Sequence, residues 1–268
     1  MAQDIFNRRA RRAHARRADL GRHGFLRDAL ADGIADRLSV VRRDFTRVLD
    51  IGGAMGARLP GALRLGLTHG DVIGEEDRLP FADASFDLVV SAGVLQGVGD
   101  LPGALLLARR VLAPDGLFVA SFFAGATLGE VRADLLAAEI ALTGRVAART
   151  HPAVDPREGG ALLQRAGFAL PVADIDTLTV RYDHLFALLA DVRGMGEGNA
   201  LTQRAPLRRD VLADAAARFA ARAGPDGRIA VNVDVVTLTG WAPAPSQPQP
   251  LARGSGKVSL ARALNSRV

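Results

Sequence analysis

Apolar residues in this chain follow two patterns, short continuous runs and longer stripes that recur every three to four positions. Continuous runs are typical of strands buried on both faces of a parallel sheet, and they occur at 47–51, 86–91 and 117–123. Between the last two runs, Asp100 to Leu112 carries a helical stripe with Pro102 in its first turn. A Pro-Asp-Gly turn follows the stripe. The order of strand, helix, turn and strand predicts a βαβ unit.

The rest of the chain adds helices and two late strands. A stripe from Leu26 to Leu38 predicts a helix beside the first strand, and Thr127 with Glu130 has the spacing of a helix capping box. Two β-rich runs near the end predict antiparallel strands that close one edge of the sheet. We therefore expect an α/β fold, a parallel sheet flanked by helices. The other predicted elements are helices at 127–142, 156–167, 185–192 and 208–223 and strands at 176–182 and 229–240.

The segment RVLDIGGAMG, from Arg47 to Gly56, predicts a strand that turns through glycines toward a helix. Glycines let backbone N–H groups approach a ligand closely, and such sheets bind ligands beyond the carboxyl ends of their strands. In the pattern D-x-G-x-G-x-G, Ala54 stands at the middle glycine. We expect a backbone cost of about 1 kcal/mol or more where an alanine adopts a positive φ angle.

The connection after this turn is short. Only 23 positions separate Gly56 from Leu79, where a strand, a helix and another strand normally fit. Asp71 follows Asp50 by 21 positions, the distance at which an acid holds the ribose in dinucleotide-binding folds. Glu75 comes four positions later. We therefore expect that the crossover helix is missing, together with either a strand or the ribose contact.

Composition indicates one compact domain with appendages. The chain has 268 residues, an apolar fraction of 49% and a mean hydropathy of +0.13. It has no cysteine, which excludes disulfides, thiolate metal sites and thiol nucleophiles. We see no signal peptide and no membrane-spanning run, so we expect a cytoplasmic protein. We divide the chain into a basic helical arm (1–38), a main domain (39–241) and an extended tail (242–268) rich in Pro, Gln, Ser and Gly.

Arginines crowd the N-terminal arm. Lys257 is the only lysine among the 34 basic residues, a bias that indicates a GC-rich genome rather than a ligand. Such an arm binds an acidic protein partner, RNA or anionic lipid, or it is a solvated helix face, and these alternatives stay open. An aromatic content of 5% argues against a stacking platform for single-stranded nucleic acid. The arm carries Arg8, Arg9, Arg11, Arg12, Arg16, Arg17, Arg22 and Arg27.

Specific motifs follow the glycine turn. LPFADASFDLVVS precedes the helix DLPGALLLARRVL and the strand in LAPDGLFVASF, and this combination resembles the class I S-adenosylmethionine-dependent methyltransferases from about Val48 to Phe123. The segments DIFNRR, GDVIGEEDRLPF, LQRAGFALPVADIDTLTVRY and VRGMGEGNAL resemble one branch of them. That branch is the mitochondrial complex I assembly factor known as an arginine hydroxylase, with its proteobacterial relatives, near the malonyl-carrier-protein methyltransferases of biotin synthesis.

The resemblance implies a Rossmann-like class I methyltransferase sheet and S-adenosylmethionine as cofactor. The short connection after Gly56 departs from the family pattern and indicates a truncated region between the second and third strands. The glycine turn would hold the methionine end, Asp71 is the candidate for the ribose, and Glu75 or Glu76 would reach the adenine amino group. Two further residues would line the pocket at the fourth strand. The expected cofactor-binding residues are Asp50, Gly52, Gly53, Gly56, Asp71, Glu75, Glu76, Ser91 and Ala92.

Gln96 and Gly97 stand where the branch usually has His-Trp. A histidine there would suit proton transfer near neutral pH, and a tryptophan would wall the pocket. We therefore assign no catalytic residue. The five histidines have no metal-ligand spacing, so we expect no metal site; they are His14, His23, His69, His151 and His184.

Two hypotheses of function stay open. The first is an S-adenosylmethionine-dependent enzyme that modifies a protein, by resemblance an arginine on a subunit of respiratory complex I, since methyl transfer depends mainly on alignment. The second is a non-catalytic assembly factor that keeps the fold and a partner surface, including the arm and the VRGMGEGN loop, while cofactor binding has weakened or decayed. An RNA-modifying enzyme is a weaker third. The expected location is the bacterial cytoplasm, with peripheral membrane contact as an alternative.

Overall fold

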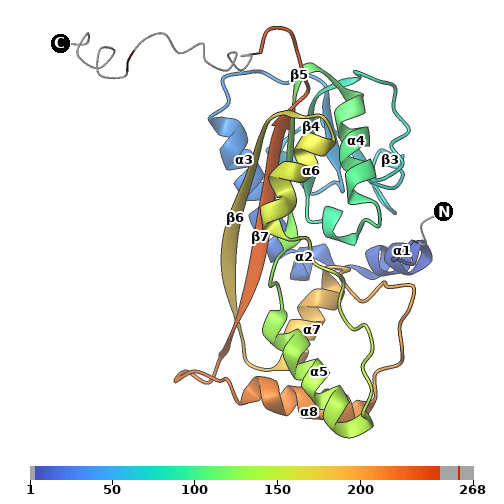
Figure 1. The fold of residues 1–268 in the computed structure, drawn as a ribbon, viewed down its shortest axis with the longest axis vertical. Coiled ribbons are helices and arrows are strands. Elements are labelled where there is room, and N and C mark those ends of the chain that lie inside the picture. Colours follow the sequence, from blue (N-terminus) through green and yellow to red (C-terminus); the bar gives the residue numbers. More distant parts are fainter. Residues whose placement is uncertain (1–3, 248–258, 260–268) are drawn as a thin grey trace.

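The computed structural model describes residues 4–247 and residue 259. Within them, one sheet of seven strands has the order β3-β2-β1-β4-β5-β7-β6 (Figure 1). The strands from β3 to β5 are parallel, whereas β7 runs antiparallel to both β5 and β6. The strands are β1 (Val48–Ile51), β2 (Leu63–Gly66), β3 (Val72–Ile73), β4 (Phe86–Ala92), β5 (Leu112–Ala124), β6 (Ala169–Tyr182) and β7 (Ile229–Trp241).

Helices cover both faces of the sheet. The seven residues of β4 are all buried, as the continuous apolar run predicted. Alternate side chains of β4 point to opposite faces, so Leu88 and Val90 pack with α3 (Phe25–Ser39), while Val89 packs on the side of α4 (Leu101–Val111) and α6 (Gly159–Arg165). The predicted class, an α/β sheet flanked by helices with antiparallel late strands at one edge, is confirmed.

A second group of helices lies beyond the main body of the sheet. In Figure 1, α5 (Gly129–Thr143), α7 (Leu185–Gly194) and α8 (Arg209–Ala220) gather beside the ends of β6 and β7. Their shared apolar core includes Phe219 and Tyr182. The short helices α1 (Arg8–Arg17) and α2 (Leu20–His23) lie between this group and the sheet (Figure 1).

The segment after the glycine turn is truncated, as predicted. Only a 3-10 turn, Gly56–Arg58, follows β1, and residues 67–71 join β2 to β3 without a helix. Of the two expected alternatives, a lost strand or a lost ribose contact, the loss of a strand is excluded, because both β2 and β3 are present with four and two residues.

One local prediction is wrong. Thr127 does not cap α5, since its hydroxyl donates to the carbonyls of Ala124 and Asp234, and Leu128 occupies the N-cap position with φ +55°. The antiparallel strand β7 supplies the competing acceptor, a contact that local spacing does not reveal. The predicted tail, 242–268, lies outside the described residues except for 242–247 and Ser259. Across the described residues, no helix is long and apolar enough to cross a membrane.

Candidate functional site

The glycine turn follows β1 at the carboxyl end of the sheet. Gly52 donates its backbone N–H to the carbonyl of Leu65 at 2.7 Å, and the buried carboxylate of Asp50 accepts from the N–H of Met55 at 2.9 Å. Burial raises the pKa of Asp50. The φ angles of Gly52 and Gly53 are +103° and +68°, a region that side chains disfavour. Asp50 therefore acts on the turn itself, by holding its backbone in place.

Ala54 does not strain this turn. Gly52, Gly53 and Gly56 have positive φ angles, but Ala54 does not. Its side chain instead packs at the edge of the apolar core that contains Met55. The backbone cost expected from an alanine at this position is therefore absent, because the positive angles fall on the glycines that remain.

A cavity of about 290 Å³ lies at the turn and is here called the glycine-turn cavity. Its wall combines Gly52 and Gly53 with the loop after β2, and with Gly93 and Val94 after β4. Its lining also includes residues of α1 and α2, together with residues 195–198 and Ala200. The carboxyl ends of β1, β2 and β4 thus meet one N-terminal helix pair, the arrangement expected of a ligand site in a parallel α/β sheet.

Six of the nine residues expected to bind the cofactor do not line this cavity, namely Asp50, Gly56, Asp71, Glu75, Ser91 and Ala92. Ser91 and Ala92 are buried in β4, and it is the next residue, Gly93, that reaches the cavity. Gly56 also lies outside the wall. Asp71 is exposed and forms two hydrogen bonds to the Arg64 guanidinium, at 3.1 and 2.9 Å, which lower its pKa to about 2. A ribose contact by Asp71 would have to compete with this ion pair.

The acidic segment 75–77 is bound by the N-terminal helix. Glu75 and Glu76 are buried, yet only Glu76 reaches the glycine-turn cavity. We call this set of ion pairs the α1 latch. It joins Arg8 to Asp77 at 2.9 and 2.7 Å, Arg8 to Glu75, Arg11 to Glu76 at 2.9 and 3.2 Å, and Arg12 to Glu75 at 2.9 Å.

The latch gives part of the basic arm an intramolecular role. Three arm arginines neutralise the acids that sequence reasoning had assigned to the cofactor. The alternatives of an acidic partner, RNA, lipid or a solvated face now concern the exposed Arg9, Arg16, Arg17 and Arg22, for which the described residues provide no acidic partner.

Arg27 projects from α3 across the end of the sheet. Its guanidinium donates to the carbonyl of Gly52 at 3.1 Å and lines the glycine-turn cavity. Its Nε is buried, and it has no hydrogen-bond partner in the part of the chain that the structure describes. The site therefore holds a cation with a free donor beside the glycine turn. From the sequence, Arg27 was considered only as part of the basic arm. The periodicity of a helix does not predict that this side chain points toward the glycine turn.

A second cavity, of about 430 Å³, adjoins the first and is here called the α5–α7 cavity. Residues of α5 and α7 line it, together with residues from the ends of β5, β6 and β7 and from segment 149–153. His151, Met195, Glu197 and Gly198 line both cavities. These shared residues form a wall between two sites that could hold two reactants side by side.

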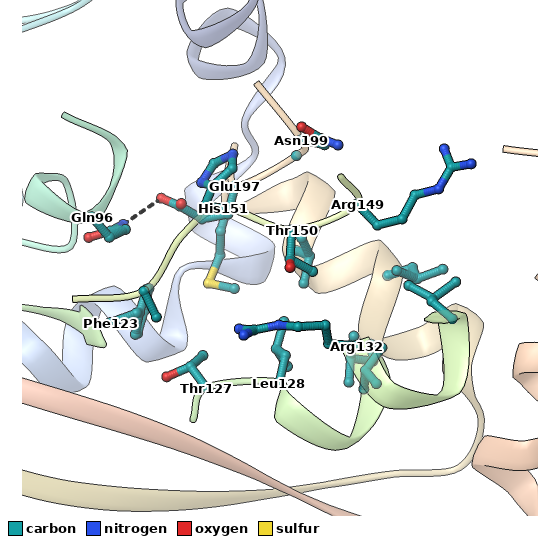
Figure 2. A pocket seen from close by; sticks show the side chains of 18 of the residues that line it. Gln96, Phe123, Thr127, Leu128, Arg132, Arg149, Thr150, His151, Glu197 and Asn199 are labelled. Atoms are coloured by element: carbon teal, nitrogen blue, oxygen red, sulfur yellow. Dashed lines mark hydrogen bonds between the residues drawn. The ribbon is translucent and has the colours of Figure 1, made fainter. Parts of the chain in front are cut away.

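Polar groups meet at this wall. Figure 2 shows Glu197 hydrogen-bonded to Gln96, whose Nε2 donates to Glu197 Oε1 at 2.9 Å, with His151 beside them. Burial raises the pKa of Glu197, while burial lowers the pKa of His151 to about 4. His151 Nε2 accepts from the backbone N–H of Ala200 at 3.1 Å. Near neutral pH the wall therefore presents a neutral imidazole and a carboxyl group that holds its proton more tightly than usual.

Sequence reasoning missed the α5–α7 cavity and the roles of Glu197 and His151. The available signal was the VRGMGEGN loop, where glycines flank a lone acid, but it was considered only as a partner surface. Glu197 lies 101 residues from Gln96 along the chain. Such a contact depends on how α7 docks against the sheet.

Comparison with known proteins defines the class. Residues 60–120 match the family model described as a methyltransferase domain. The fold is shared with a putative methyltransferase from Bacillus halodurans (TM-score 0.51, 11% identity, 79% of this chain and 98% of that chain). It is also shared with a methyltransferase from Thermotoga maritima (TM-score 0.50, 13% identity, 87% and 99%). The fold is that of the class I methyltransferases.

Full-length relatives define the branch. The mouse protein named Arginine-hydroxylase NDUFAF5, mitochondrial, is 34% identical over 97% of this chain and 83% of its own length. The human protein of that name is 32% identical over 96% and 82%. A malonyl-[acyl-carrier protein] O-methyltransferase from Halorhodospira halophila is 32% identical over 90% and 89%. This chain belongs to the NDUFAF5 family.

Proposed function

We propose that the glycine-turn cavity binds S-adenosylmethionine and that the protein modifies an acceptor placed in the α5–α7 cavity. The observation that carries this proposal is the shared wall, because a ligand in one cavity lies beside a ligand in the other. The class I fold and the methyltransferase names of several relatives support the choice of cofactor.

The residues of the glycine-turn cavity fit such a cofactor. Arg27 has a free buried donor that suits the carboxylate of an amino acid. Glu76 supplies a carboxylate at the cavity, for which an amino group would compete with the Arg11 guanidinium. A Cβ atom at Gly52 would lie 2.7 Å from Val94, so only glycine fits there. At Gly53 the nearest atom to a Cβ would be 3.9 Å away, which leaves room toward the cavity.

The chemistry follows from alignment. S-adenosylmethionine supplies a methyl group on a positively charged sulfonium, and its transfer to a nucleophile depends mainly on proximity and orientation. The chain's part is to separate and orient the two ligands. Gln96 holds the carboxyl group of Glu197 at the wall. Because His151 Nε2 already accepts from Ala200, the neutral imidazole carries its proton on Nδ1 and provides a donor where the two cavities meet.

Calorimetry with S-adenosylhomocysteine tests this proposal. We expect micromolar binding by the wild-type protein. Gly53→Asn adds a side chain into the cavity at a positive φ that asparagine tolerates, and should weaken binding about tenfold or more. Gly61→Asn is the matched control, because Gly61 also has a positive φ (+85°), has open space around its Cβ position and lies outside both cavities.

Two results would contradict the proposal. One is the absence of heat up to millimolar ligand. The other is an equal loss of binding in Gly53→Asn and Gly61→Asn, since a general backbone effect would then explain both variants.

The partner is proposed from the resemblance described above. We infer that the acceptor is carried by a protein, that the protein acts in the cytoplasm, and that its action assists assembly of respiratory complex I. Two names among the relatives support a protein-borne acceptor: one is an arginine hydroxylase, and the other is an O-methyltransferase of malonyl-[acyl-carrier protein].

A second candidate function is a non-catalytic assembly factor. The α1 latch favours it, because the acidic segment 75–77 is already neutralised by arginines of the same chain. Cells that lack the protein separate the two functions. Equal rescue of complex I activity by wild type and by Gly53→Asn supports scaffolding, whereas loss of rescue in Gly53→Asn but not in Gly61→Asn supports an enzyme.

A further inference from the structure

The α5–α7 cavity has an apolar body. Its lining includes Leu128 at the N-cap of α5, Val131 and Leu135 of α5, Leu188 of α7, and Phe123 near the end of β5. A cavity of about 430 Å³ is within the size range of small-molecule sites, which typically combine apolar walls with a few polar groups. The ligand that fits it is therefore mainly apolar.

More basic than acidic side chains line this cavity. Four arginines line it, Arg132, Arg149, Arg193 and Arg204, against a single acid, Glu197, at the wall. Two of these arginines are already engaged within the chain: Arg149 pairs with Glu139, and Arg204 donates to a backbone carbonyl. Figure 2 shows that the Arg149 side chain points away from the cavity.

Arg132 differs from these two. In Figure 2 its side chain extends into the cavity above Thr127 and Leu128. Its Nε is buried and has no hydrogen-bond partner among the described residues, and none of the described carboxylates lies within ion-pair distance of it. A buried donor without a partner costs free energy, so the cavity favours a ligand that supplies an acceptor there.

We propose that the α5–α7 cavity binds an amphiphilic carboxylate, with its apolar chain along α5 and α7 and its carboxylate on Arg132. This inference rests on the proposed function, which places the acceptor in this cavity, and it adds the chemical class of that acceptor. A guanidinium group, by contrast, would meet Arg132 as a like charge and would leave its donors unpaired.

Three probes with the same alkyl chain test the site by calorimetry: decanoate, decan-1-ol and decyltrimethylammonium, each kept below its micelle threshold. We expect decanoate to bind about tenfold more tightly than the alcohol, since a charge-assisted hydrogen bond forms only with the carboxylate. The ammonium probe should bind more weakly than the alcohol.

Variants assign the effect to one side chain. Arg132→Gln should reduce decanoate binding to that of the alcohol, while Arg132→Lys should retain most of the preference. Arg145→Gln is the control, because Arg145 is an exposed cation just after α5 that makes no ion pair with the described residues. If Arg132→Gln does not fold, the wild-type order of the three probes still decides.

Equal binding of decanoate and decanol, or tightest binding of the ammonium probe, would overturn this inference. So would a loss in Arg145→Gln as large as that in Arg132→Gln, which would indicate overall charge. The proposed function is tested separately, because S-adenosylhomocysteine titrations report on the other cavity. Decanoate selectivity without S-adenosylhomocysteine binding would overturn the proposed function alone.

Discussion

The α1 latch allows a quantitative prediction at its most buried pair. Arg11 is 12% exposed and Glu76 is 3% exposed, and both carboxylate oxygens accept from the Arg11 guanidinium. The perturbation is Arg11→Gln. It leaves Glu76 as a buried carboxylate without a cation, because the described structure gives it no other ion-pair partner.

The magnitude follows from this burial. Removing one member of a buried ion pair costs about 3–5 kcal/mol, and the lower end, about 3 kcal/mol, applies here because Arg11 keeps some contact with solvent. The double variant Arg11→Gln/Glu76→Gln has no buried charge at this place. It should cost only about 1 kcal/mol, so the two single changes should not add.

Equilibrium urea unfolding measures these free energies. The set is wild type, both single variants, the double variant and the control Arg9→Gln. Arg9 lies on the same helix, exposed and without an acidic partner among the described residues, so its loss should cost less than about 0.5 kcal/mol. The coupling between Arg11 and Glu76 should also persist at high salt, because buried pairs are poorly screened.

The reasoning is wrong if Arg11→Gln costs no more than Arg9→Gln. It is also wrong if the coupling energy is below about 0.5 kcal/mol, the scatter of independent sites. Either result would mean that the N-terminal helix is held by packing, and that the acids 75–77 are free to bind a ligand.

Two further predictions concern pH. The pKa of His151 is lowered by burial to about 4, whereas its unfolded pKa is about 6.5, so the unfolded state binds more protons between these values and wild-type stability should rise with pH through this window. Urea unfolding across the window should show a smaller rise in His151→Gln, and equal slopes would contradict the assignment. Burial raises the pKa of Glu197, so the folded state keeps this proton to a higher pH than the unfolded state does. Glu197 therefore lowers the stability of the fold as pH rises through its folded pKa. Glu197→Gln should therefore gain stability relative to wild type from acid to neutral pH, and a difference that does not change with pH would refute this.

Much of the fold could be predicted because its signals are local. The run at 86–91 is apolar at four of its six positions, three of them consecutive, and a strand covered on both faces buries such a run. The stripe at 100–112 similarly predicted α4. The truncation after Gly56 was predicted by chain length alone, since too few residues remain for another helix.

The site was predicted less completely. Gly52, Gly53 and Glu76 do line a cavity, as expected from residues at the ends of neighbouring strands. Asp71 and Glu75 do not line it; Asp71 pairs with Arg64 of β2, and Glu75 pairs with Arg12 of α1. Position along the chain indicates which end of the sheet an acid occupies, but the pairing of Glu75 with Arg12 depends on the docking of a helix 63 residues away.

By itself, the sequence determined the order of strands and helices, the glycine turn and the family, because hydrophobic period, glycine placement and residue motifs are properties of neighbouring residues. Tertiary structure decided the rest. It closed α1 over the acids 75–77, placed Glu197 against Gln96 and opened a second cavity beside the first. These features join residues far apart in the chain, and their energies depend on burial and distance, which arise only when the elements pack.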